Sequence, residues 1–143
     1  MAKRIKKMNT ELLIDGENIG AGKAEKIMKA AKSQGELFES KVYGLQKDAH
    51  TRRWSDKARE YGINDIRLYG KPEKDKVDKK LCKDARKVIR DHKNVDVICI
   101  VTSDGGYVKD VEEMRNVGKR IVIIGESRAP EKLRKCCNKF IEI

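Results

Sequence analysis

Asp15 and Asp104 each follow a short apolar run, and this placement could bring two carboxylates together. Asp15 comes directly after the run at 12–14, and Asp104 follows the run at 98–101 after two further residues. If both runs are strands, the two acids lie at strand carboxyl ends, the edge of an open α/β sheet where ligands bind. They would repel each other there unless a cation or a shared proton lay between them. Hard oxygen ligands suit Mg²⁺ or Mn²⁺, and Asn18 could add an amide oxygen or orient a water.

Helix capping is the alternative explanation for these two acids. An Asp in a turn between a strand and a helix commonly accepts hydrogen bonds from the first helical amides. For a single Asp we would favour the cap. Two acids at equivalent strand ends, together with the acid described next, favour a metal site instead.

Asp78 lies inside the apolar stripe of a predicted helix. The segment 76–91 has helical periodicity, and at about 100° per residue its apolar side chains fall within an arc of roughly 140°. These side chains are Val77, Leu81, Cys82, Ala85, Val88 and Ile89. Asp78 falls within the same arc, where a carboxylate usually has a partner or a metal, although the first helical turn would also suit a cap. Asp84 falls near the edge of the stripe, so its case is weaker.

The charge balance favours a polyanionic partner. Lys and Arg outnumber Asp and Glu by 34 to 23, and the formal net charge is +11. Neutralising nucleic-acid phosphates releases condensed counterions, so nucleic acid is the first candidate and an anionic membrane surface the second. A merely soluble basic protein would have the same composition. No stretch is long enough to span a bilayer, and the basic start of the chain is not a signal peptide.

Basic side chains around the acidic edge are the candidates for holding a nucleic acid. They are Lys23, Lys47, Arg52, Arg53, Lys71, Lys74 and Lys76. Trp54 could stack on a base, but its helical spacing with Ala58 and Tyr61 is more typical of a core residue. The polar segment 71–76 indicates either a mobile loop beside the site or a solvated linker.

Alternating strands and helices are needed to position these residues. Strands are predicted at 12–14, 37–43, 66–69, 95–101, 121–124 and 140–143, and helices at about 24–33, 52–61 and 76–91. This alternation is typical of an α/β fold with a mostly parallel sheet. The nearly all-apolar run 95–101 is typical of a central strand covered on both faces. The pattern predicts a basic tail at 1–10 and a single domain at 11–143.

The cysteines at 82, 99, 136 and 137 lack CxxC spacing. Reduced and mostly buried thiols explain them better than disulfides or a zinc site. We therefore expect a cytoplasmic protein.

Several motifs resemble those of the NYN domain, a PIN-like nuclease group that includes bacterial LabA-like proteins. In order, they are Leu13-Ile14-Asp15-Gly16-Glu17-Asn18-Ile19, Val77-Asp78 with Leu81 and Asp84-Ala85, Val101-Thr102-Ser103-Asp104-Gly105-Gly106-Tyr107-Val108, and Gly118-Lys119-Arg120 leading into Ile121-Val122-Ile123-Ile124-Gly125. The resemblance runs from about residue 12 to residue 143, with the motifs at similar spacing.

The resemblance implies a PIN-like three-layer α/β/α sandwich around a mostly parallel sheet. It also implies that Asp15, Asp78 and Asp104 bind Mg²⁺ or Mn²⁺ and hydrolyse RNA phosphodiester bonds, leaving a 5′-phosphate. Asn18 and the Ser103 hydroxyl fall at positions that support the metal or its waters. Asp84 belongs to the central helix and is a further supporting candidate.

Position 106 departs from the family pattern. The third motif usually carries a second Asp two residues after the first, where this sequence has Gly106. Asp110 lies four residues later, on the same helical face as position 106, and could partly replace the missing carboxylate as a metal ligand. An ordinary surface Asp near a helix start is the alternative.

Two other functions compete with a ribonuclease. An RNA-binding adaptor could keep the fold and lose catalysis with the acid at position 106. A Rossmann-like nucleotide-binding protein is suggested by the segment 20–23, Gly-Ala-Gly-Lys, which lacks the full phosphate-loop pattern.

Overall fold

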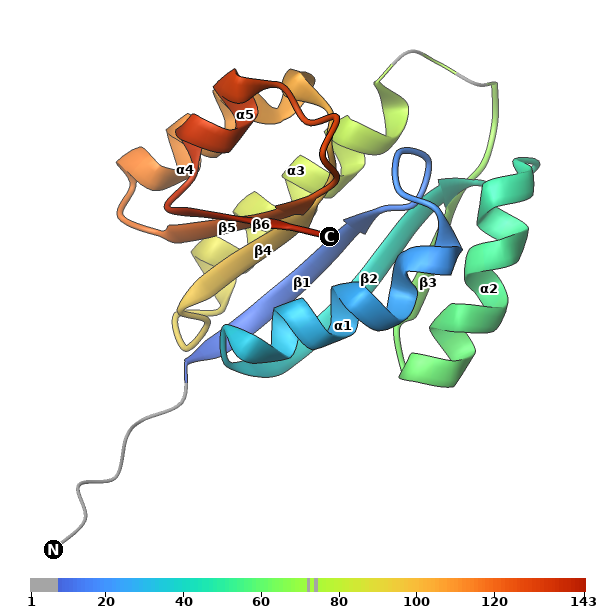
Figure 1. Ribbon diagram of the computed structural model, residues 1–143, viewed down its shortest axis with the longest axis horizontal. Helices are drawn as coiled ribbons and strands as arrows, with labels where there is room; N and C mark the ends of the chain where they lie inside the picture. The colour runs from blue at the N-terminus through green and yellow to red at the C-terminus, as the bar shows by residue number, and fades with distance from the viewer. Residues whose placement is uncertain (1–7, 72, 74) are drawn as a thin grey trace, which may run out of the picture.

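A sheet of six strands forms the middle layer of the molecule (Figure 1). In the computed structural model, which describes residues 8–71, 73 and 75–143, they lie in the order β3-β2-β1-β4-β5-β6. Their bounds are Asn9–Asp15 for β1, Glu36–Leu45 for β2, Asn64–Leu68 for β3, Val97–Val101 for β4, Arg120–Gly125 for β5 and Lys139–Glu142 for β6. Each neighbouring pair is parallel, so the sheet is fully parallel where a mostly parallel one was predicted.

Five α-helices cover the two faces of the sheet in the described part of the chain. They are α1 (Ala24–Ser33), α2 (Ala49–Tyr61), α3 (Lys76–Asp91), α4 (Val108–Asn116) and α5 (Glu131–Cys136), with short 3₁₀ turns η1 (Ala21–Lys23) and η2 (Gly105–Tyr107) before α1 and α4. Side chains of α3, α4 and α5 pack in one core cluster, and those of α1 and α2 pack in the other. The predicted three-layer α/β/α sandwich is therefore confirmed (Figure 1).

The strand order places a topological switch between β1 and β4. The chain runs from β1 outward through β2 to β3, and then returns through α3 to β4 on the other side of β1. The loop after β1 leads to α1 on one face, whereas the loop after β4 leads to α4 on the opposite face. Diverging loops of this kind open a crevice at the carboxyl edge of a parallel sheet.

The alternation of side chains along β1 places Asp15 on the face of the sheet that α3 covers. Leu12 and Ile14 pack in the cluster beneath α1 and α2, and Leu13 packs in the cluster beneath α3. Because alternate side chains of a strand share a face, Asp15 lies on the α3 face together with Leu13. The apolar stripe of α3 is buried against the same face, with Leu81 fully inaccessible. A truncation of Leu81 to Ala would cost about 2–5 kcal/mol of stability.

The predicted elements agree with the structure to within two or three residues at most boundaries. The run 95–101 differs because Val95, although buried, lies in a turn whose amide donates to the carbonyl of His92, so β4 begins at Val97. Trp54 is a core residue, 1% exposed, and its indole N–H donates to the carbonyl of Ile19 at 2.8 Å. It is therefore not available to stack on a base. The four cysteines are buried free thiols, as predicted.

Candidate functional site

Asp15 ends β1 in a buried setting with four hydrogen-bond donors. The hydroxyls of Tyr107 and Thr102 lie 3.0 and 3.4 Å from its Oδ2 atom, and the amides of Glu17 and Asn18 lie 3.2 Å from Oδ1. Burial raises the pKa of Asp15 in spite of these donors, and the charge of Asp104 adds to the rise. Asp15 therefore caps the turn after β1 and not a helix, as the alternative interpretation held, and it is also a member of an acidic group.

The turn after Asp15 passes very close to β2. The amide of Gly16 donates to the carbonyl of Tyr43 at 2.9 Å, and a Cβ atom at Gly16 would meet that same oxygen at 2.6 Å. No side chain fits in this space. Glycine at this position therefore lets the chain turn at the sheet edge and hold Asp15 against its donors.

Asp78 faces Asp15 from the first turn of α3. Burial, together with repulsion from Asp15, Asp104 and Asp75, raises the pKa of Asp78 to about 6, although a hydrogen bond from Tyr107 opposes the rise. The Tyr107 side chain is fully buried, and burial beside these acids also raises its own pKa. Its hydroxyl therefore stays protonated and serves as a donor to the acidic group.

Asp104 completes the group from the turn after β4. Its Oδ1 atom accepts a hydrogen bond from the amide of Gly106 at 2.9 Å, so it caps η2. The side chain is partly exposed and lines the same pocket as Asp15 and Asp78. The three acids come from β1, from α3 and from the turn after β4, the three places predicted from the sequence.

The pocket that these acids share has a volume of about 270 Å³ and opens to solvent. Its lining consists of Asp15, Glu17, Asn18, Leu45, Glu73, Asp75, Lys76, Val77, Asp78 and Asp104. Most polar residues of this lining are carboxylates. Among the described residues, Lys76 is the one basic residue that lines the pocket. A net acidic pocket in a protein of formal charge +11 would attract cations.

The donor chemistry of the pocket fits a hard divalent cation, since carboxylate oxygens are the ligands that Mg²⁺ and Mn²⁺ prefer. Asp15, Asp78 and Asp104 share one pocket and repel one another. Within the described residues, however, no three His, Cys, Asp or Glu side chains are already gathered as a metal-binding group. The lining therefore supplies suitable ligand atoms, but these side chains are not yet arranged around a single metal position.

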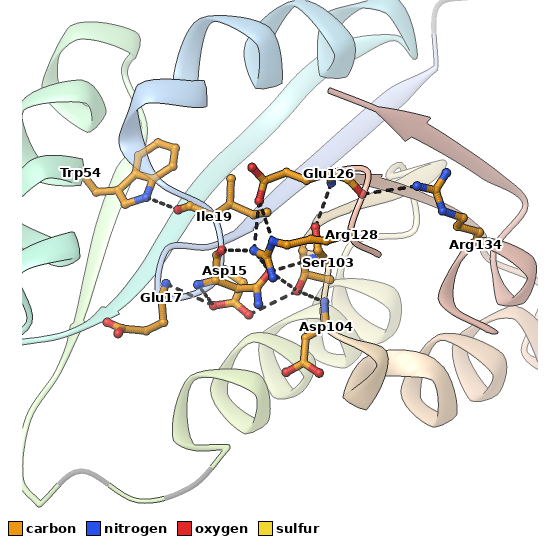
Figure 2. Close-up of polar contacts among 11 residues, drawn as sticks. Asp15, Glu17, Ile19, Trp54, Ser103, Asp104, Glu126, Arg128 and Arg134 are labelled. Atoms are coloured by element: carbon orange, nitrogen blue, oxygen red, sulfur yellow. Dashed lines mark hydrogen bonds and ion pairs between the residues drawn. The ribbon is translucent and has the colours of Figure 1, made fainter. Parts of the chain in front are cut away.

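The two polar candidates at the strand ends have different surroundings. Asn18 lines the pocket, and its side-chain oxygen accepts from the amide of Ser103 at 2.8 Å. The Ser103 side chain instead turns toward β5, where its hydroxyl oxygen accepts from the amide of Glu126 at 2.8 Å (Figure 2). Ser103 thus ties together the turns after β4 and β5 and is not part of the pocket lining.

Asp84 and Asp110 lie outside this pocket. Asp84 accepts hydrogen bonds from the Tyr43 hydroxyl at 2.7 Å and from Lys80 at 3.0 Å. Burial alone would raise the pKa of Asp84, but these two donors outweigh burial and lower it. Its contacts anchor α3 to β2. Asp110 pairs with Arg86 at 2.7 Å in a neighbouring groove that also contains Gly106 and Asp78.

Of the predicted basic residues that the structure describes, only Lys76 lines the acidic pocket. Its Nζ atom donates to the backbone carbonyls of Tyr69 and Lys71. Exposed side chains, none of them in the lining, are those of Lys47, Arg52, Arg53 and Lys71. Lys23 is half-buried in η1. Lys74 lies outside the described residues.

Several residues of the site were not predicted. Glu17 lines the pocket, but its Oε1 atom accepts from the amide of Leu45 at 2.8 Å, and burial beside Asp48 raises its pKa to about 7. Tyr107 donates to Asp15. Both residues stand inside motifs already singled out, so proximity in sequence could have suggested them. Arg128 contacts Asn18 across 110 residues of chain, and no local pattern signals that contact.

Comparison with known proteins gives a fold relative and a family. A crystal structure of a Vibrio parahaemolyticus protein of unknown function superposes with a TM-score of 0.79 at 21% sequence identity, covering 99% of this chain and 96% of that one. At this identity the likeness shows the fold alone. No curated protein matches the chain. The family model of the NYN domain matches residues 9–143, and the chain therefore belongs to the NYN domain family.

Proposed function

We propose that the protein is a divalent-metal-dependent ribonuclease that cuts RNA at the pocket lined by Asp15, Asp78 and Asp104. The NYN domain is a PIN-like nuclease family, which suggests ribonuclease activity. The observation that carries the proposal is the convergence of three carboxylates, from separate parts of the chain, on one open pocket, where Asp104 raises the pKa of Asp15 and both of these acids raise the pKa of Asp78. Such repulsion is relieved when a divalent cation binds.

In this proposal the residues of the pocket have different roles. Mg²⁺ or Mn²⁺, when held by the three carboxylates, would neutralise charge on an RNA phosphate and acidify an attacking water. Asp15 is fixed by Tyr107 and Thr102, which keep its carboxylate oriented toward the pocket. Asp78 and Asp104 are partly exposed and can adjust toward the cation. Departure of the 3′ oxygen would leave a 5′-phosphate.

RNA would reach the pocket across the basic surface around it. Lys76 stands at the rim, and Lys47, Lys71, Arg52 and Arg53 are exposed. Cations of this kind attract the RNA backbone without reading its sequence. We therefore propose RNA as the partner, held mainly through its phosphates.

A second candidate function is an RNA-binding adaptor without catalytic turnover. The observation that favours it is Gly106, which leaves one family carboxylate missing beside Asp104. Asp110, the proposed substitute ligand, is already paired with Arg86. An adaptor would bind RNA with strong salt dependence and show no metal-dependent cleavage.

End-labelled RNA separates the two functions. Single-stranded and hairpin RNAs are incubated with the protein in Mg²⁺, in Mn²⁺ or in excess chelator. Asp104→Asn runs alongside as the test variant, and Asp91→Asn, which alters an exposed acid at the far end of α3, serves as the control for contaminating ribonuclease. Cleavage that needs metal, persists in Asp91→Asn and is lost in Asp104→Asn supports the ribonuclease. Equal RNA binding with no cleavage by any of the three proteins supports the adaptor.

A further inference from the structure

The side-chain amide of Asn18 has a chemically fixed orientation. Its Oδ1 atom lies 2.8 Å from the amide nitrogen of Ser103 and 3.3 Å from the Nη2 atom of Arg128. A backbone N–H and a guanidinium can only donate hydrogen bonds, so the acceptor end of the amide must face them. The oxygen and nitrogen of Asn18 therefore cannot be exchanged without setting donor against donor.

This orientation decides what Asn18 can offer to the pocket. A carbonyl oxygen has two lone pairs, and here Ser103 and Arg128 already use them. The oxygen is thus poorly available to a cation. The Nδ2 atom forms no hydrogen bond with the described residues, while Asn18 lines the acidic pocket. The free group that remains is a neutral N–H₂ donor, which suits an anionic oxygen and not a metal.

Arg128 holds the amide in place from the loop after β5. Its Nη2 atom donates to the backbone carbonyl of Asn18 at 2.6 Å, and Glu126 accepts from its Nε and Nη2 atoms at 3.2 and 3.0 Å. Figure 2 shows the Arg128 guanidinium between Glu126 and the turn that follows Asp15. Glu126 is anchored in turn by the bond from its amide to Ser103. Arg128 therefore joins the loops after β1 and β5, and Ser103 links both of them to the loop after β4.

We propose that Asn18 is a substrate-binding residue that donates an N–H to a phosphate oxygen of RNA, and that Arg128 is the positioning residue that fixes this donor. The assignment rests on the proposed function, which brings a phosphate into the pocket. It replaces the expectation that Asn18 supports the metal. A donor beside three carboxylates also gives the pocket, in addition to Lys76, a neutral group that can bind phosphate when a cation occupies the acids.

The test compares two variants that add the same charge to the site. Asn18→Asp keeps the oxygen that faces Ser103 and Arg128 and removes the N–H₂ donor, whereas Gly106→Asp adds a carboxylate beside Asp104 and leaves the donor intact. Binding of labelled single-stranded RNA is followed by anisotropy with Ca²⁺ in place of Mg²⁺ over a range of salt concentrations. Mn²⁺ affinity is measured separately by electron paramagnetic resonance.

We expect Asn18→Asp to weaken RNA binding about tenfold more than Gly106→Asp at every salt concentration, because it alone loses a hydrogen bond to a charged group. Mn²⁺ affinity should rise no more in Asn18→Asp than in Gly106→Asp. Arg128→Lys, which keeps the charge and loses the forked geometry, should weaken RNA binding about threefold.

Equal RNA affinities for the two Asp variants would overturn the role of Asn18, as would a rise in Mn²⁺ affinity confined to Asn18→Asp. Wild-type affinity in Arg128→Lys would overturn the positioning role. If the unaltered protein fails to bind RNA, the proposed function and this assignment fall together. If the unaltered protein binds and cuts RNA, but Asn18→Asp and Gly106→Asp have the same RNA affinity, only the role assigned to Asn18 is wrong.

Discussion

Two buried carboxylates on β1, Glu11 and Asp15, differ sharply in what surrounds them. They lie four residues apart on the same face of the strand, and burial raises the pKa of both. Asp15 has four donors, whereas neither oxygen of Glu11 accepts a hydrogen bond from any residue that the structure describes. Lys41 approaches Glu11 only to 3.6 Å, and Glu39 repels it.

The difference shows that Asp15 belongs to an organised site, whereas the charge of Glu11 would destabilise the fold. A raised pKa is common to both acids, so it does not by itself mark function. Asp15 stands at the carboxyl edge, in a pocket with two further acids, and its donors fix its direction. Glu11 lies deeper in the sheet, away from that pocket, and its charged form is poorly compensated. Function is indicated by the pocket and the donors, not by burial.

The largest expected effect comes from Asp15→Asn. This change removes a charge from the proposed metal ligands while keeping the size of the side chain. We expect metal-dependent RNA cleavage to fall at least about a hundredfold, which corresponds to about 3 kcal/mol of lost transition-state stabilisation. Glu11→Gln is the matched control and should cleave at the unaltered rate. Equal losses in the two variants would remove the distinction drawn between the two acids.

Glu11→Gln should instead change how stability depends on pH. The pKa of Glu11 rises from 4.5 to about 7 on folding. Between these values the folded chain keeps a proton that the unfolded chain has released, so the free energy of unfolding falls as pH rises. The fall amounts to about 3 kcal/mol and is complete above the folded pKa.

In Glu11→Gln this contribution disappears, and the variant should be more stable than the unaltered protein at pH 8. Urea unfolding at pH 5, 6, 7 and 8 measures the difference. Parallel stability profiles for the two proteins would mean that Glu11 is compensated by groups such as Lys41 in the folded chain.

Tyr107→Phe would make Asp15 more like Glu11. It removes the hydroxyl that lies 3.0 Å from Oδ2, so burial should raise the pKa of Asp15 further and weaken cation binding. We expect about a tenfold loss of Mn²⁺ affinity at pH 7, since a hydrogen bond to a charged group contributes about 1.5 kcal/mol. Tyr43→Phe, which removes a donor to Asp84 on the same sheet face, is the control and should leave Mn²⁺ affinity unchanged. A similar loss in both would point to general destabilisation.

The fold and the three acids could be predicted because their signals are local. The runs at 12–14 and 98–101 are apolar enough to be buried strands, and an acid after such a run lies at the sheet edge. Asp78 was found from helical periodicity within a single segment. These inferences need only neighbours in the sequence.

The remaining features depend on contacts between distant segments. Glu11 gave no signal, because an acid near the start of a strand is ordinary unless the helix that covers it is known. Arg128 meets Asn18 only when the sheet brings the loops after β1 and β5 together. The orientation of the Asn18 amide depends on this contact with Arg128. The sequence could therefore suggest that Asn18 belongs to the site, but not whether its oxygen or its nitrogen faces the pocket.

Gly106→Asp should have the smallest effect and sharpens the account of the acidic pocket. A Cβ atom at position 106 would lie 3.3 Å from the Oδ1 atom of Asp104, so Asp104 must shift slightly to accept the new side chain. The added carboxylate would strengthen Mn²⁺ binding a few-fold if it joins the ligands. A gain in metal-dependent cleavage with that affinity would show that the missing acid limits activity. Unchanged affinity would instead mean that Asp15, Asp78 and Asp104 are sufficient, and that the glycine keeps the groove beside Asp78 open.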